Sequence, residues 1–248
     1  MEFLLYLLFG AALGTLGGIF GIGGGLIAIP LLGVWFGLDQ QIAQGTALVM
    51  VVPNVMLALW RYHQRNRIEL RHALPLALMG FCFAWIGSIW AVGIDAQTMR
   101  IGFVAFLVVL SAYNLLKMFG KQPAATSEMR YSWPWLGVLG AASGTMGGLF
   151  GVGGAVVATP VLTSLFGTTQ VVAQGLSLAL ALPSTGVTLV TYAVHHEVDW
   201  MIGLPLAIGG LASISWGVKV AHAMPEKLLR GLFCGFLVLC AVMLAFKV

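Results

Sequence analysis

Charged residues are scarce in this sequence. Only 8% of its 248 residues are Asp, Glu, Lys or Arg, whereas 60% are hydrophobic, and the mean hydropathy is +0.98. Soluble domains are typically about 25% charged, so this chain has too few charges to cover an aqueous surface. The composition therefore excludes a soluble enzyme, a nucleic-acid-binding domain and a disordered tail.

Paired cysteines and acidic residues within apolar runs are missing as well. Cys82, Cys234 and Cys240 form no Cys-x-x-Cys pair, and their odd number argues against a closed disulfide framework. The eight Asp and Glu residues all lie at the ends of apolar runs or between them, although proton relays in membranes commonly use acidic residues within spans. We expect no metal, cofactor or catalytic set. The absence of carboxylates within the predicted spans favours an anionic substrate, because fixed negative charges there would repel it.

Long apolar runs make up most of the chain. A bilayer core about 30 Å thick needs roughly 20 apolar residues of helix, and β-barrel strands would instead alternate with period two. The runs are apolar throughout, which predicts an all-α polytopic protein whose first run is a retained membrane helix. The expected segments are 3–20, 25–37, 42–60, 73–94 and 98–118, followed by 133–150, 155–167, 171–194, 203–222 and 227–247.

An internal duplication relates the two halves of the chain. Residues 14–24 read GTLGGIFGIGG and residues 144–154 read GTMGGLFGVGG, a shift of 130 positions. The same shift aligns two Ala-Gln-Gly triplets and pairs Tyr62 with Tyr192, and 19 of the 41 positions in 14–54 are identical in 144–184. Secondary transporters are often built from such repeats. We divide the chain into a first transmembrane repeat, 1–118, a cytoplasmic linker, 119–132, and a second transmembrane repeat, 133–248.

The basic residues suggest opposite orientations for the two repeats. Lys and Arg that flank spans gather on the cytoplasmic side. The loop 61–72 has four arginines, whereas its counterpart 191–202 has no Lys or Arg. With inverted repeats, all but Arg100 and Lys247 of the 12 basic residues fall on the cytoplasmic side. We predict two inverted-topology repeats of about five hydrophobic segments each, in a bacterial inner membrane, with both termini on the non-cytoplasmic side.

The glycine-rich motifs are candidate working parts. Glycine costs about 1 kcal/mol relative to alanine inside a helix, so the motifs should break the first helix of each repeat. The short segments that follow, 25–37 and 155–167, either cross fully or are re-entrant, and their free N–H groups would favour an anion. A second interpretation remains open, in which the glycines form close helix-packing seams. The candidate substrate-binding glycines are Gly17, Gly18, Gly21, Gly23, Gly24, Gly147, Gly148, Gly151, Gly153 and Gly154.

Few polar side chains accompany these glycines. Gln44 and Gln174 lie in the two Ala-Gln-Gly triplets, where their amides either donate to an anion or form interhelical hydrogen bonds. Thr15 and Thr145 lie within the glycine motifs and either line a cavity or bond to the helix backbone. We include all four as candidate substrate contacts.

The paired motif G-T-x-G-G-x-F-G-x-G-G, each copy followed by an apolar stretch with a proline, resembles the sulfite exporter TauE/SafE family of bacterial membrane permeases. The resemblance extends through both halves and includes the Ala-Gln-Gly triplets. It implies a multi-spanning inner-membrane permease for small anions, typically sulfite, organosulfonates or related sulfur or carboxylate species. Ala155 stands where the first copy has Gly25, so the halves need not bind equally.

These observations predict a secondary transporter of a small anion that works by alternating access around the paired glycine loops, with H⁺ or Na⁺ as a possible coupling ion. Two alternatives belong to other classes. One is a membrane thiol-electron relay that would use the cysteines. The other is a non-transporting membrane partner subunit.

Overall fold

The computed structural model describes residues 2–65, 68–119 and 133–245, and within these ranges every regular element is a helix. The predicted linker 119–132 lies outside the described residues except for its first residue. The all-helical prediction is confirmed, and the helices follow the expected segments closely. They are α1 (Glu2–Phe20), α2 (Gly25–Trp35), α3 (Gln40–Arg65), α4 (Leu70–Val92), α5 (Ala96–Phe119), α6 (Trp133–Phe150), α7 (Ala155–Ser164), α8 (Gln170–Val194), α9 (Trp200–Ala223) and α10 (Glu226–Ala245).

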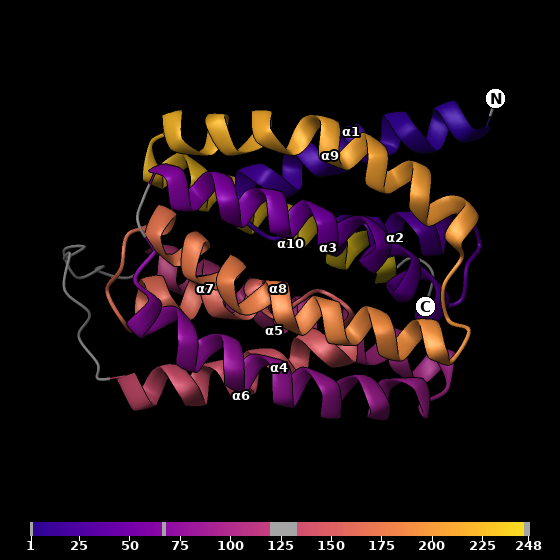
Figure 1. The fold of residues 1–248 in the computed structure, drawn as a ribbon, viewed down its shortest axis with the longest axis horizontal. Helices are drawn as coiled ribbons and strands as arrows, with labels where there is room; N and C mark the ends of the chain where they lie inside the picture. The colour runs from indigo at the N-terminus through magenta and orange to yellow at the C-terminus, as the bar shows by residue number, and fades with distance from the viewer. Residues whose placement is uncertain (1, 66–67, 120–132, 246–248) are drawn as a thin grey trace.

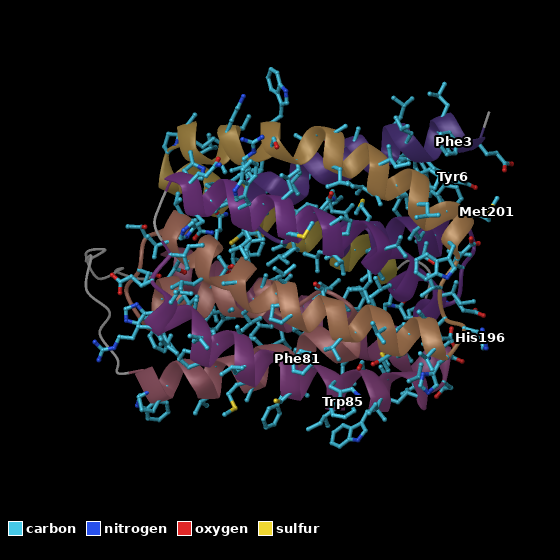
Figure 2. The ribbon with its side chains drawn as sticks, viewed as in Figure 1. Phe3, Tyr6, Phe81, Trp85, His196 and Met201 are labelled. Carbon is cyan, nitrogen blue, oxygen red and sulfur yellow. The ribbon has the colours of Figure 1, made fainter. Side chains whose placement is uncertain are left out.

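The outer surface of the bundle is apolar. Trp85 on α4 points away from the molecule at the bottom of Figure 2, and both Trp85 and Phe81 on the same helix are exposed. Six of the described helices are long and apolar enough to cross a membrane. A bilayer accommodates such a surface because helices satisfy their backbone hydrogen bonds internally.

Each half contributes a helix to the packing of the other half. Helix α1 lies along α9 at the top of Figure 1, and α4 lies along α6 at the bottom. The shift of 130 residues converts α1 into α6 and α9 into α4, so these two helix pairs are equivalent. The halves therefore interlock through their first and fourth helices.

Glycines allow these helix pairs to pack closely. A Cβ on Gly14 would lie 2.5 Å from the Cα of Gly210, and a Cβ on Gly144 would lie 2.8 Å from the Cα of Gly80. Such contacts require glycine because any side chain would meet the backbone of the neighbouring helix. The seam against α9 consists of Gly10, Gly14 and Gly18, and the seam against α4 consists of Gly140, Gly144 and Gly148. Part of each glycine motif therefore serves helix packing.

Helices α1 and α2 form a hairpin. In the first half of α1, the ring centroid of Phe9 lies 5.4 Å from that of Trp35 at the end of α2. The ring centroids of Tyr6 and Phe36 lie 5.3 Å apart. The eleven residues of α2 rise only about 16 Å, so the chain turns at the glycine motif and returns toward its starting end. Helices α6 and α7 form the matching hairpin, because residues near the start of α6 and the end of α7 line one surface pocket.

The central helices α3 and α8 start at opposite ends of the bundle. Near the start of α3, Thr46 Oγ1 accepts a hydrogen bond from Asp199 N at 2.9 Å, and Gln41 Nε2 donates to Ile94 O at 2.6 Å. At the other end, Ile68 lies beside Gly175 near the start of α8. Helices α3 and α8 therefore run antiparallel, and α1 begins and α10 ends at the same end of the bundle, on the right in Figure 1.

Candidate substrate site at the paired glycine bends

Three glycines in each motif have backbone angles that side chains strongly disfavour. Their φ values are positive, in the left-handed region where a glycine has no Cβ penalty. The first bend has φ values of 66° at Gly21, 71° at Gly23 and 92° at Gly24, and the second has 67° at Gly151, 74° at Gly153 and 70° at Gly154. The two bends therefore share one conformation, which explains why the sequence repeats these glycines.

Each bend leads directly into a short helix. The N-cap residues are Gly24 for α2 and Gly154 for α7, and neither position has a side-chain cap. Gly17 and Gly147 are close to the bend within their own repeats, since a Cβ on either would contact the backbone nitrogen of Gly24 or Gly154. The first N–H groups of a helix have no intrahelical partner and lie at the positive end of the helix dipole. Both bends therefore have the chemistry of an anion site.

Each bend lies against the glutamine of the other repeat. A Cβ on Gly21 would lie 2.8 Å from the Cβ of Gln174, and a Cβ on Gly151 would lie 3.1 Å from the Cβ of Gln44. The bends also approach each other, because a Cβ on Gly25 would lie 3.7 Å from the carbonyl oxygen of Gly151. The structure therefore brings together the bend glycines and both predicted glutamines.

Two buried tyrosines, absent from the predicted site, join the glutamines. The hydroxyl of Tyr62 donates to Gln174 Oε1 at 2.9 Å, and that of Tyr192 donates to Gln44 Oε1 at 2.8 Å. All four side chains have no exposed surface. Each bond joins α3 to α8, and thus one repeat to the other. The sequence feature that could have pointed to these tyrosines is the alignment of Tyr62 with Tyr192 under the repeat shift. That alignment does not indicate that glutamines are their partners.

The same side chains hold the last turn of the helix before each bend. Tyr62 also donates to Gly18 O at 3.2 Å, and Gln174 Nε2 donates to Ile19 O at 3.2 Å. In the second repeat, Tyr192 donates to Leu149 O at 3.1 Å. These carbonyls lie where the glycine bend leaves the helix without its next turn. Side chains from α3 and α8 thus replace part of the missing helix bonding.

Thr15 and Thr145 form hydrogen bonds within their own helices. Their hydroxyls donate to the carbonyl oxygens of Ala11 at 3.0 Å and Ala141 at 2.9 Å. This arrangement matches the backbone-bonding alternative considered for both residues.

The residues after the paired prolines support the bends. Asn54 Nδ2 donates to Gly23 O at 3.3 Å, and Ser184 Oγ donates to Gly153 O at 3.2 Å. Both residues are fully buried on the central helices. Each central helix therefore contacts the bend of its own repeat through its middle and the bend of the other repeat through its glutamine.

The polar groups around the bends are uncharged. Among the described residues, the buried polar side chains are those of Gln, Asn, Ser, Thr and Tyr, and no Asp, Glu, Lys, Arg or His is buried. Neutral amide, hydroxyl and backbone donors could hold an anion without a fixed positive charge. Over the same residues, no group of three His, Cys, Asp or Glu could hold a metal ion.

The acidic loop between α8 and α9 is a separate feature. Asp199 caps α9, accepting hydrogen bonds from Met201 N at 2.9 Å and Ile202 N at 3.2 Å. Partial burial, followed by the negative charge of Asp39, raises the pKa of Glu197 above its ordinary value. The role of Asp199 is therefore to cap α9.

These features define a class of protein. The molecule is a multi-pass membrane protein with an apolar exterior, two glycine-broken helices and an interior of uncharged polar groups. Broken helices whose ends meet inside a helical bundle are typical of transporters.

Comparison with known proteins identifies the family. The chain matches the model of the family described as "Sulfite exporter TauE/SafE" over residues 6–244, and it belongs to that family. The resemblance predicted from the glycine motifs is thereby confirmed.

Several curated relatives carry the same general description. A probable membrane transporter protein of Xylella fastidiosa (strain 9a5c) is 31% identical over 220 residues, covering 86% of this chain and 81% of the relative. A probable membrane transporter protein of Methanocaldococcus jannaschii is 26% identical, covering 92% of this chain and 91% of the relative. The Arabidopsis thaliana sulfite exporter TauE/SafE family protein 3 is 28% identical over 131 residues, 48% of this chain. The chain is thus a member of a family of membrane transporters.

Proposed function

We propose that the protein is a secondary transporter of a small anion, either a sulfur oxyanion, an organosulfonate or a small carboxylate. The observation that carries the proposal is the meeting of two uncapped helix N-termini inside the bundle, among uncharged donors. Such N-termini favour negative charge. The description of the family as sulfite exporters agrees with this substrate class.

The proposed membrane arrangement is an inverted repeat in a bacterial inner membrane. The α1–α2 hairpin would re-enter from the non-cytoplasmic side, where both termini lie, and the α6–α7 hairpin from the cytoplasmic side. This orientation is supported by the arginines Arg61 and Arg71, which flank the α3–α4 connection, and by the acidic residues Glu197 and Asp199 in the α8–α9 connection. The positive-inside rule orients such loops.

The proposed mechanism is alternating access around the two bends. The anion would be held by the bend glycines together with Gln44 and Gln174. The Tyr–Gln bonds lie at opposite ends of α3 and α8, so breaking one pair while keeping the other would loosen one end of the bundle at a time. Coupling to H⁺ or Na⁺ would supply the driving force.

Reconstituted flux tests the proposal. Purified protein in liposomes is expected to move radiolabelled sulfite, thiosulfate, an alkyl sulfonate or acetate down an imposed gradient. No flux with any of the four anions would refute it, and would favour the partner-subunit alternative.

A matched pair of variants locates the transport path. Gly25 faces the other bend, and the nearest atom to a Cβ there is a side-chain atom, Val51 Cγ2 at 2.8 Å, rather than backbone. Gly25→Leu should abolish flux, and a wild-type Tm of the variant shows that the fold is retained. Gly235→Leu is the control, since a Cβ on Gly235 has no atom within 4 Å. Gly24 is a poorer choice, because its φ of 92° makes any side chain a test of folding.

The thiol-relay alternative has a direct test of its own. Cys82 is exposed on α4, whereas Cys234 and Cys240 are buried on α10. Replacing all three cysteines by serine should leave anion flux intact. Loss of flux in a folded triple variant would favour the relay.

A further inference from the structure

Ser143 places a buried hydroxyl beside the start of α7. Ser143 lies on α6 one turn before Gly147, on the helix face that meets Gly154. The backbone carbonyl oxygen of Ser143 would lie 2.5 Å from a Cβ on Gly154. The side chain has no exposed surface, and its Oγ has no hydrogen-bond partner among the described residues. A hydroxyl in this position can donate to a ligand at the helix N-terminus.

The first bend lacks this hydroxyl. The repeat shift aligns Ser143 with Leu13, whose carbonyl oxygen lies against Gly24 in the same way. Apart from Asn54, which donates to Gly23 O, the side chains that a Cβ on Gly23 or Gly24 would meet are apolar, namely Val51, Val55 and Met50. The first bend is therefore the more apolar of the two.

The glutamine amides differ in the same direction. Gln174 Nε2, at the first bend, already donates to Ile19 O. Gln44 Nε2, at the second bend, has no partner within the described part of the chain, although the residue is fully buried. Near the first bend, the atom without a partner among the described residues is an acceptor, Asn54 Oδ1, since Nδ2 donates to Gly23 O. Unsatisfied donors thus gather at the second bend, and an acceptor that would repel an anion lies at the first.

We infer that the anion binds mainly at the second bend, at the N-terminus of α7, with Ser143 Oγ and Gln44 Nε2 as side-chain donors. Burying an unpaired donor is unfavourable unless a ligand satisfies it. The inference rests on the proposed function and deepens it. The site is unequal between the repeats, and Ser143 is a binding residue that the repeat motif alone does not indicate.

A pair of serine variants tests the inference. Ser143→Ala removes the proposed donor, and Ser111→Ala removes the hydroxyl of another buried, unpartnered serine on α5. Radiolabelled sulfite and acetate are the probes, and the readouts are the KM for flux in liposomes and the Tm of the purified protein. Hydrogen bonds to charged groups correspond to about tenfold to hundredfold in affinity. Ser143→Ala should raise KM by that factor and leave Tm unchanged, and Ser111→Ala should change neither.

A pair of glutamine variants gives a second measurement. Gln44→Glu and Gln174→Glu both keep an acceptor for the neighbouring tyrosine, but each replaces an amide donor by an acidic group. Gln44→Glu should abolish saturable flux, because the new group faces the bound anion. Gln174→Glu should lower Tm through the lost bond to Ile19 O. It should also lose less flux than Gln44→Glu, because Gln174 lies at the first bend.

The outcomes separate the inference from the proposed function. Equal losses of flux for Gln44→Glu and Gln174→Glu, or a wild-type KM for Ser143→Ala, would overturn the unequal site while anion transport stands. A wild type that moves neither probe, nor thiosulfate or an alkyl sulfonate, overturns both.

Discussion

The bond between Tyr62 and Gln174 gives the most direct test of how the two repeats are held together. Tyr62→Phe removes one hydroxyl from a fully buried side chain and leaves its ring in place. The change deprives Gln174 Oε1 and Gly18 O of a donor, at 2.9 Å and 3.2 Å respectively. The variant therefore probes the link between repeats without opening a large cavity.

The expected magnitude follows from hydrogen bonds in other membrane helices. Double-mutant cycles there average about 0.6 kcal/mol and reach about 1.7 kcal/mol. Because both partners are fully buried here, we expect a coupling of about 1 kcal/mol between Tyr62→Phe and Gln174→Leu. For a protein of this size, that corresponds to about 2–4 °C in Tm.

The assay is thermal unfolding of the wild type, the two single variants and the double variant in one detergent. Tyr6→Phe serves as the control, since the Tyr6 ring packs on Phe36 and its loss of a hydroxyl should leave Tm unchanged. Gln174→Leu should cost more than Gln44→Leu, because only Gln174 has a bond to Ile19 O. Strictly additive effects of Tyr62→Phe and Gln174→Leu would refute the reasoning, since two directly bonded groups must couple.

Three further predictions concern stability. Gly14→Ala should destabilise the protein by about 1–3 kcal/mol, because its Cβ would lie 2.5 Å from the backbone of α9. In contrast, a Cβ on Gly186 has no atom within 4 Å, so Gly186→Ala should be neutral or stabilising by up to about 1 kcal/mol. Equal Tm values for the two variants would contradict the glycine seam. Asp199→Ala should remove the α9 cap and cost about 1 kcal/mol, read as a lower Tm. The raised pKa of Glu197 contributes stability that is complete below its ordinary pKa and is lost as pH rises through the raised value. Asp39→Asn should reduce that loss, and an unchanged slope of Tm against pH would contradict it.

Some features of the site follow directly from the repeat in the sequence. The bend glycines were identifiable because three bend positions with positive φ are glycine in both copies. The glutamines were identifiable because they recur in the same triplets. Their partners were not, because the bonds from Tyr62 to Gln174 and from Tyr192 to Gln44 join residues more than a hundred positions apart. The repeat shift pairs equivalent residues, whereas these contacts cross between non-equivalent ones.

The two interpretations of the glycine motifs are another case. Gly14 and Gly18 pack against α9, whereas Gly21, Gly23 and Gly24 form the bend. The sequence offered packing and bending as alternatives for the whole motif, because glycine is the residue that permits both. Only the position of the neighbouring helix separates the roles.

The sequence by itself determined that this protein is helical, embedded in a membrane and duplicated, because hydrophobic composition and repeated spacing are properties of the chain. Tertiary structure decided which helices of one half pack on the other and where the hairpins return. Among the described residues, it also left donors without a partner at one bend and an acceptor without a partner at the other. Those outcomes depend on which side chains meet across the fold, and that depends on contacts between distant residues that no local pattern encodes.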